Sequence, residues 1–590
     1  MRIPLRAAFR LALTGCLGLA AASATPARAA DPEKMLPDST LLFFKIKDVS
    51  ELRDSFKQTD FGRLLADPAM KPLEDDLAGK IADASKEVKA KLGVTIAELL
   101  SLPQGPATIA VVAKTDPKSP AALLISADAG KNAATMTDVM VKSTKQAEEA
   151  NAKVGTEAFQ GLTLHIIQPP KDGDKPNPPL VWTNAGSVFH ISSDLAVLKD
   201  LLSHADGRTD SLASVEAFAK SRAKLGEAPI TWFLDINKSI KLMVKAAQGA
   251  QAGNGGGQNA EGILQLMGIN GLKSASGTFA FNTGSYDSIS KIYFLSPAPA
   301  QGILKLFMMP QANLRPEPWV PATVARYQTM SWDLDAAYTG VNDLVNQFQP
   351  GMLQLLQQQL VGPNGGDPLD IQKDIFGPIG DRMTLIGDYK KPIKDDSRRI
   401  LFALALEDTK RFQNTLNKII EITGGAPAKR DFQGTTIYDF KIPEMPNAGG
   451  GANNPFKGGG TASLAIAKDT LYVASEPSLL ESVIRGGGSA LADSPEFQAV
   501  AKQIPARSSS LSYARSEEQA RVTYDMIKSG DLEKQFKAAP NGPDVSKVLD
   551  KSKVPDFSVF AKYLSPGGGF GLMEADGVTF TNFTLKKANP

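Results

Sequence analysis

The stretch Phe159–His165, which reads FQGLTLH, returns later in the chain as Phe432–Tyr438, which reads FQGTTIY. The match continues in the same order, since Phe189–Ser193 resembles Leu471–Ser475. Self-similarity at such a long period is the signature of a repeated structural unit. Because chance would not keep several matches in order, we interpret the chain as one domain present twice.

The elements expected in the first half apply to the second half as well. Apolar stretches with strand-like alternation predict strands at 41–47, 108–113, 121–127, 162–168, 180–192, 230–236, 277–281 and 288–295. Helices are expected between pairs of strands, at 49–65, 73–92, 134–145, 195–202 and 215–225. Short connections between adjacent strands favour antiparallel pairing. The expected class is α+β, with two tandem homologous domains, each a mostly antiparallel sheet with helices packed on one face.

Composition predicts the domain boundaries. Residues 1–29 are expected to be a signal peptide, residues 30–308 the first repeat domain and residues 322–590 the second. The segment 309–321 holds four prolines, which preclude a helix and favour an extended, stiff linker.

The first residues have the pattern of an export signal. Three arginines precede an apolar stretch at 11–22, and Ala27–Ala29 then supplies the small-x-small pattern that signal peptidase recognises. We expect cleavage after Ala29 and a periplasmic or extracellular location. Leu13–Cys16 also fits a lipobox, so a lipoprotein anchored at Cys16 is the alternative.

The charge balance argues against nucleic acid as a partner. The whole chain has 65 Lys and Arg against 63 Asp and Glu, and removal of the leader, with four arginines and no acidic residue, leaves 61 against 63. A nearly neutral chain with mixed signs lacks the basic surface that nucleic acid binding needs. No later apolar stretch approaches the ~18 residues of a transmembrane helix. The partner class left open is a protein or another component of the cell envelope.

Motifs for cofactors, metals and nucleophiles are missing from the sequence. Cys16 is the only cysteine, so disulfides and cysteine metal sites are not expected in the mature chain. Neither a G-x-S-x-G nor a Walker-type phosphate loop occurs. We assign no catalytic, cofactor-binding or metal-binding residue.

The sequence contains three histidines, and two of them are candidates for a functional site. His165 and His190 lie on strands expected to be neighbours, so a cross-strand pair with a metal or acid–base role is one interpretation. When the two repeats are aligned, Tyr438 corresponds to His165 and Tyr472 corresponds to His190. Because tyrosine replaces histidine as a half-buried strand residue but not as a zinc ligand, we interpret the two histidines as a packing pair.

The acidic candidates are interpreted in the same way. Asp48 ends the first strand, Asp333 and Asp335 are placed in the equivalent strand of the second half, and Asp235 has Ala514 opposite it. Paired carboxylates perform glycoside hydrolysis, but only four tryptophans exist to build a sugar platform. Asp at a strand end is usually a turn or cap residue.

Two further features have a structural interpretation and a recognition alternative. The leucine spacing in Gln347–Leu360 predicts an amphipathic helix, which is expected to pack on its own sheet, with docking of a partner as the alternative. The low-complexity hairpin loops at 169–179 and 446–460 are expected to be solvated, with ligand recognition as the alternative, and the Gly/Gln/Asn-rich stretch 248–262 is expected to be mobile.

A family resemblance lies in the N-terminal half. Leu36–Thr40, LPDST, then an apolar strand, then Thr59–Pro68, TDFGRLLADP, resembles a family of exported bacterial proteins known only as a domain of unknown function. The second half keeps only Pro321 and the strand after it. The resemblance implies export and an α/β repeat, and it brings no catalytic residues. We therefore expect an exported, non-enzymatic binding or structural protein. The alternative is an exported hydrolase with an unrecognised active site.

Overall fold

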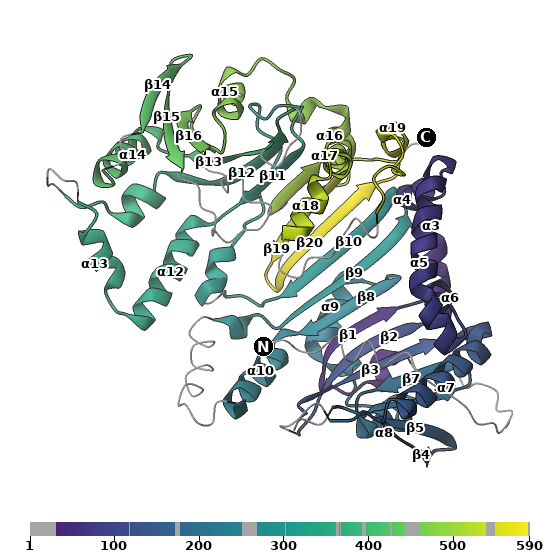
Figure 1. Ribbon diagram of the computed structural model, residues 1–590. Coiled ribbons are helices and arrows are strands. Elements are labelled where there is room, and N and C mark those ends of the chain that lie inside the picture. The colour runs from purple at the N-terminus through teal and green to yellow at the C-terminus, as the bar shows by residue number, and fades with distance from the viewer. Residues whose placement is uncertain are drawn as a thin grey trace. The chain divides into compact units, whose positions relative to one another are not determined.

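Figure 1 shows the computed structural model of the chain, which describes residues 31–116, 119–171, 177–250, 268–300, 302–361, 365, 367–391, 397–424, 427–442, 460–538 and 549–587. The expected signal peptide, Cys16 and most of the three expected low-complexity loops lie outside these residues. No helix in the described ranges has both the length and the apolar character that a membrane crossing requires.

The chain divides into two compact units. The first takes in the chain up to Glu261 together with Leu272–Thr283 and Ser290–Leu295. The second takes in Gly262–Gly271, Gly284–Ile289 and the chain from Ser296 onward.

The strands of the first unit pair in an antiparallel manner. In spatial order they are β4 (Lys153–Phe159), β5 (Leu162–Gln168), β6 (Leu180–Ala185), β7 (Val188–Ser192), β3 (Ala121–Asp128), β2 (Ala107–Ala113), β1 (Thr40–Ile46), β8 (Ile230–Asp235) and β9 (Ser274–Thr283). A hairpin joins β9 to β10 (Tyr286–Leu295).

The strands of the second unit follow the same pairing pattern, strand for strand. In spatial order they are β14 (Ala428–Phe432), β15 (Thr435–Ile442), β16 (Gly460–Ala467), β17 (Thr470–Ala474), β13 (Arg398–Leu406), β12 (Ile379–Tyr389), β11 (Arg326–Ser331), β18 (Ser510–Ala514), β19 (Gly567–Glu574) and β20 (Gly577–Leu585). The prediction of an antiparallel sheet combined with helices is confirmed.

Helices lie against both faces of the sheet, so the expectation of helices on one face is wrong. Val181 and Trp182 are adjacent on β6, so their side chains point to opposite faces. Helix α8 (Leu195–Ser203) packs in the cluster that contains Val181, whereas α7 (Ala133–Glu149) packs in the cluster that contains Trp182. The sequence could not assign the faces because both of these side chains are apolar.

The remaining helices of the first unit are α2 (Pro32–Met35), α3 (Val49–Lys57), α4 (Asp60–Leu65), α5 (Lys71–Leu92), α6 (Ile96–Ser101), α9 (Glu216–Leu225) and α10 (Ile236–Ala250). Its largest core cluster lies between the sheet and α9. There the Phe218 ring meets those of Phe43 and Phe233 edge to face, with centroids 5.7 and 5.2 Å away. Edge-to-face contacts of this kind add to the stabilisation from burial.

The second unit has the helices α12 (Leu334–Phe348), α13 (Met352–Gln358), α14 (Thr409–Ile422), α15 (Pro477–Arg485), α16 (Pro495–Ala501), α17 (Ser516–Ser529), α18 (Asp531–Ala538) and α19 (Phe557–Ala561). The predicted linker 309–321 belongs to this unit. Leu314 and Val320 are buried in its core, and Ala312 pairs with Ser508.

One predicted strand is two strands. The stretch 180–192 folds as β6 and β7, joined by a two-residue turn in which Gly186 has a φ of 63°. Glycine adopts this conformation without strain, and such turns suit tight hairpins. The split places β6 between the strands of His165 and His190, which are therefore not neighbours.

Candidate functional site

A row of directly opposed residues crosses the first unit's sheet on one face. Residues opposite each other on paired strands point to the same face. From β5 to β9 the row consists of His165, Trp182, Ile191, Ile125, Ile109, Phe44, Trp232 and Gly277. We call the part of this face on β1, β2, β3 and β8 the apolar face. It comprises Leu42, Phe44, Ile46, Ile109, Val111, Leu123, Ile125, Ile230, Trp232 and Leu234.

The apolar face is open to solvent to an unusual degree for its composition. The opposite face of the same strands carries Phe43, Ala110 and Phe233, which are at most 1% exposed. On the apolar face, Phe44 and Trp232 are only half-buried, and Ile109 is 39% exposed. Antiparallel sheets commonly pair one apolar face with one polar, solvated face. An apolar second face that stays partly exposed is typical of a binding surface.

The second unit carries a matching row with different chemistry. In the same strand order it consists of Tyr438, Leu464, Val473, Phe402, Leu385, Gln328, Ser512 and Gly569. Gln328 therefore takes the position of Phe44, and Ser512 takes the position of Trp232. The second unit replaces the aromatic centre of the row by polar side chains, so the apolar face is particular to the first unit.

Trp232 packs against a glycine on the neighbouring strand. A Cβ atom built on Gly277 would lie 2.5 Å from Trp232 Nε1 and 2.6 Å from Cε2. Real Cβ atoms do not approach other atoms so closely, so only glycine permits the observed position of the indole. The glycine and the indole together define this end of the apolar face.

Helices border the apolar face on two sides. On one side the Phe56 ring of α3 meets Phe281 of β9, with ring centroids 5.4 Å apart. On the other side α7 packs on Trp182 through Met140. The half-exposed residues of β1, β2 and β8 lie between these two contacts.

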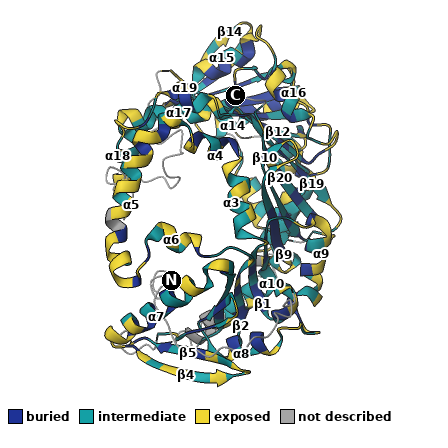
Figure 2. Cartoon of the chain, turned by 90° about the vertical axis from the view of Figure 1, so that its right-hand side faces the viewer, coloured by how far each residue is buried: buried dark blue, intermediate teal, exposed yellow. Residues whose placement is uncertain are grey.

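Helix α5 belongs to the same part of the first unit, and its apolar stripe is unevenly buried. Leu73 and Leu92, near its two ends, are buried. Ile81, on the same apolar stripe at helical spacing, is 48% exposed. Figure 2 shows α5 between α4 and α6, with exposed residues along its middle. The apolar stripe of α5 is therefore exposed at Ile81, whereas Ser85, one turn later, is buried.

The two histidines on the sheet have separate, structural partners. His165 stacks on the Trp182 indole, with centroids 4.0 Å apart and planes inclined by 7°. His190 is buried and shares a hydrogen bond of 2.8 Å between its Nδ1 atom and the Ser126 hydroxyl. Burial lowers the pKa of His190 to about 4, so the ring is neutral at physiological pH. The predicted cross-strand histidine pair is wrong because β6 separates the two rings.

The acidic candidates act as caps and turn residues. Asp48 and Asp333 precede α3 and α12, and each accepts a 2.8 Å hydrogen bond from a backbone N–H of the first helical turn. Asp335 lies in α12 rather than in a strand, which corrects its predicted placement. Such caps satisfy backbone donors at a helix start.

Asp235 is the most buried of these carboxylates. It accepts a 2.8 Å hydrogen bond from the Lys238 backbone N–H, and its other oxygen lies 3.3 Å from Lys238 Nζ. Its counterpart in the second unit is Arg515, because Ala514 takes the position of Leu234. The predicted match of Asp235 with Ala514 is therefore off by one residue.

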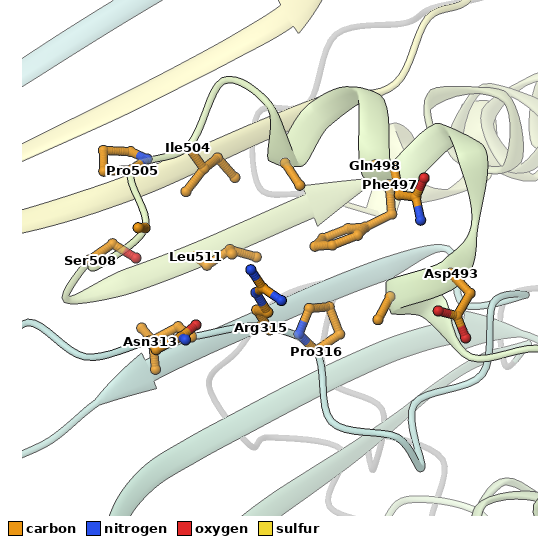
Figure 3. A pocket seen from close by; sticks show the side chains of 14 residues that line it. Asn313, Arg315, Pro316, Asp493, Phe497, Gln498, Ile504, Pro505, Ser508 and Leu511 are labelled. Carbon is orange, nitrogen blue, oxygen red and sulfur yellow. The ribbon is translucent and has the colours of Figure 1, made fainter.

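A groove of about 520 Å³ opens in the second unit. Its lining comes from the 313–316 segment, from the residues around α16 and from the start of β18. Figure 3 shows Arg315 near Leu511 and Pro316, with the Phe497 ring directed toward the same space. Phe497 and Leu511 are buried, whereas Arg315 and Asp493 are exposed at the rim. The groove thus combines an apolar floor with charges of both signs.

The predicted amphipathic helix at 347–360 is found in part as α13, which follows α12 after a break at 349–351. Met352, Leu355 and Leu356 are exposed, at 37%, 55% and 43%. The expected packing of these side chains on the sheet is therefore not observed.

The described residues contain no cluster of three or more His, Cys, Asp or Glu side chains arranged to hold a metal ion. A comparison with known protein families, characterised proteins and solved structures gives no match.

Sequence reasoning missed Phe44, Ile109 and Trp232 as site residues. A signal for them exists in the strand sequences LLFFKI (Leu41–Ile46) and ITWFL (Ile230–Leu234), which are apolar at almost every position instead of alternating. Such stretches indicate strands with two apolar faces.

Proposed function

We propose that the chain is an exported, non-enzymatic binding protein that takes the acyl chain of an amphiphile on the apolar face of its first unit. The observation that carries the proposal is the partial exposure of Ile109, Phe44 and Trp232 on a sheet whose opposite face is a closed core. Apolar surface of this kind gains about 25 cal/mol per Å² when a ligand covers it.

The dimensions of the apolar face favour an elongated ligand. From Ile191 on β7 to Trp232 on β8 the row crosses four spacings between strands. At about 4.8 Å per spacing, the apolar part of the row is about 19 Å long. An extended hydrocarbon chain fits such a strip better than a compact ring system. A cell envelope offers many single-chain and double-chain amphiphiles, which agrees with the export that the leader sequence suggests.

The pairing pattern shared by the two units supports a duplication as their origin. We propose that the units diverged in ligand chemistry, because the positions of Phe44 and Trp232 carry Gln328 and Ser512 in the second unit. The second unit then serves as an internal reference, with the same strand geometry and a polar centre.

The test is a fluorescence titration of the mature chain with 1-N-phenylnaphthylamine, followed by displacement with palmitate. We expect Ile109→Gln to weaken palmitate binding about tenfold, because the loss of about 1.4 kcal/mol corresponds to that factor. The matched control is Leu385→Gln, at the equivalent place in the second unit. We expect this control to change binding by less than about twofold.

The proposal fails if the wild-type chain does not enhance the fluorescence of the probe. It also fails if Ile109→Gln and Leu385→Gln weaken palmitate binding equally, since the site would then not lie on the apolar face. Circular dichroism and thermal unfolding of both variants establish that each is folded.

A further inference from the structure

We propose that the groove of the second unit is a separate binding site for an extended peptide segment, with a bulky apolar side chain next to an acidic one. The groove differs from the cavity beside the matching helix and strand of the first unit. In the first unit the corresponding cavity, lined by Phe218, Arg222 and Leu225 among others, measures about 10 Å³. In the second unit the volume is about 520 Å³, which is the size of a ligand site rather than a packing defect.

The side chains differ at the positions that the two cavities share, while the 313–316 segment lines the cavity of the second unit only. In the first unit Arg222 lines the small cavity, and its guanidinium donates to the Gly226 carbonyl and the Thr231 hydroxyl, both at 3.3 Å, and to the Glu227 carboxylate. In the second unit the corresponding positions on the helix and the strand carry Ala501 and Leu511. The arginine is gone, and leucine replaces the hydroxyl that accepted its hydrogen bond. The second unit therefore has space and an apolar lining where the first has a filled, polar contact.

The floor of the groove suits one bulky apolar side chain. Leu314, Phe497 and Leu511 are 3%, 4% and 6% exposed and belong to the core of the second unit. They are held in place by the core itself, so a ligand side chain meets a preformed surface. A preformed surface reduces the ordering that binding requires.

The rim of the groove supplies charge selection. Arg315 and Asp493 line it on opposite walls, one on the 313–316 segment and the other beside α16. Within the described part of the chain, neither side chain has a hydrogen-bonded or ionic partner, so Arg315 is free to receive a carboxylate. The planar guanidinium can bind a carboxylate through two parallel hydrogen bonds.

The backbone at the groove favours a peptide over a compact ligand. Ala312 and Ser508 exchange two backbone hydrogen bonds of 2.9 Å, and the two segments then separate to form the groove. Beyond this bridge, Asn313 and Leu314 make no backbone–backbone hydrogen bond with any described residue. An extended peptide between the segments would pair with these groups of the 313–316 segment only, because β18 on the other side already pairs with β11 and β19.

The test uses the full mature chain on arrays of immobilised hexapeptides. The first array holds a central Phe-Glu pair and varies the four outer positions, and matched arrays hold Phe-Lys and Ser-Glu pairs. We expect the binders to concentrate in the Phe-Glu array, with at least about fivefold less signal in the Phe-Lys array, which corresponds to about 1 kcal/mol for one exposed ion pair.

Two variants locate the site. Ala501→Arg introduces the residue of the first unit and should reduce peptide binding more than tenfold. Arg315→Gln, at an exposed position that folding tolerates, should remove the preference for glutamate over lysine. The control is Lys502→Ala, which neighbours Ala501 but does not line the groove, and it should bind as the wild type does.

Three results would overturn the proposal. One is a wild-type chain that binds none of the arrays. Another is an Ala501→Arg variant with unchanged thermal unfolding and unchanged peptide binding. A third is an Arg315→Gln variant that still prefers glutamate. Because Ile109 lies in the other unit, Ile109→Gln should not alter peptide binding. The peptide site and the ligand site on the apolar face are therefore tested independently of each other.

Discussion

The Nε1 atom of Trp232 lies 2.5 Å from the point where a Cβ atom of residue 277 would stand, so the indole rests directly on the Gly277 backbone. Gly277→Ala must displace the ring, because the carbonyl of Lys291, 2.8 Å from the same point, closes the other side. We expect a cost of about 1–3 kcal/mol in the free energy of unfolding, as for other overpacked sites.

The same variant should lower palmitate affinity and shift the Trp232 emission to longer wavelength. The contribution of Trp232 is taken as the difference between each chain and its Trp232→Phe counterpart. Gly155→Ala is the control, since nothing lies within 4 Å of a Cβ there. Equal emission spectra for Gly277→Ala and the wild type would show that the indole does not depend on the glycine.

His190 makes the stability of the chain depend on pH. Its pKa in the folded protein is about 4 because of burial, below the ordinary value of 6.5. The unfolded chain therefore binds a proton first as the pH falls, and stability present above pH 6.5 is lost progressively down to pH 4. The loss should reach about 3 kcal/mol, from 1.36 kcal/mol per pKa unit. The measurement is urea unfolding at pH 7 and pH 4.

His190→Tyr copies the residue that the second unit carries at this position, Tyr472. We expect the variant to lose less stability than the wild type between pH 7 and pH 4, because carboxylates contribute equally to both chains. If the free energy of unfolding falls equally in both chains between pH 7 and pH 4, His190 is not the source of the pH dependence.

Gly62 permits the close approach of α3 and α4. A Cβ atom at this position would lie 2.2 Å from the carbonyl oxygen of Phe56. Gly62→Ala should therefore destabilise the chain by about 2 kcal/mol or more, since the helices must move apart. Gly79→Ala, in the middle of α5 with nothing nearby, should instead stabilise by up to about 1 kcal/mol. The measurement is thermal unfolding of both variants. A change in melting temperature of the same sign in both would contradict this explanation.

Glu317 attaches the proline-rich segment to the second unit. Its carboxylate accepts hydrogen bonds from the Tyr327 hydroxyl at 3.0 Å and the Thr384 hydroxyl at 2.5 Å, and it lies 3.1 Å from Arg382 Nε. Burial raises the pKa of Tyr327, which keeps its hydroxyl protonated as the donor. Glu317→Gln should cost about 1–3 kcal/mol, because buried partners lose a charged acceptor.

The readout for Glu317→Gln is thermal unfolding together with the rate of chymotrypsin cleavage after Trp319, in the same segment, which should rise. The exposed Glu517 provides the control, and Glu517→Gln should leave both measurements unchanged. If cleavage after Trp319 is equally slow in Glu317→Gln and in the wild type, the carboxylate does not hold the segment.

The sequence alone could predict the order of most strands and the correspondence between particular residues. Tyr438 holds the strand position of His165, and Tyr472 holds that of His190, as the recurrence of FQG and the following strands suggested. Such matches need only local similarity along the chain. The residue correspondence is therefore correct even where the predicted neighbouring strands are wrong.

The apolar face could not be derived in the same way. Phe44 and Phe43 are adjacent aromatic residues of one strand, and nothing in the sequence says which of them is covered. Coverage depends on where α7, α8 and α9 pack, which is a tertiary property. The groove could not be predicted either, because it depends on how the 313–316 segment packs against Phe497, Ala501 and Leu511.

The segment before β11 has a consequence for any attempt to produce the second unit separately. Val320 accepts a backbone hydrogen bond from Leu491, just as Leu36 accepts one from Leu212 near the start of the first unit. A chain begun at Ala322 would lose Leu314 and Val320 and leave their core places empty. A chain begun at Met309, itself buried, would retain them. In each unit, the segment before the first strand therefore completes the core. A cloning boundary for the second unit should lie before the prolines of this segment, not after them.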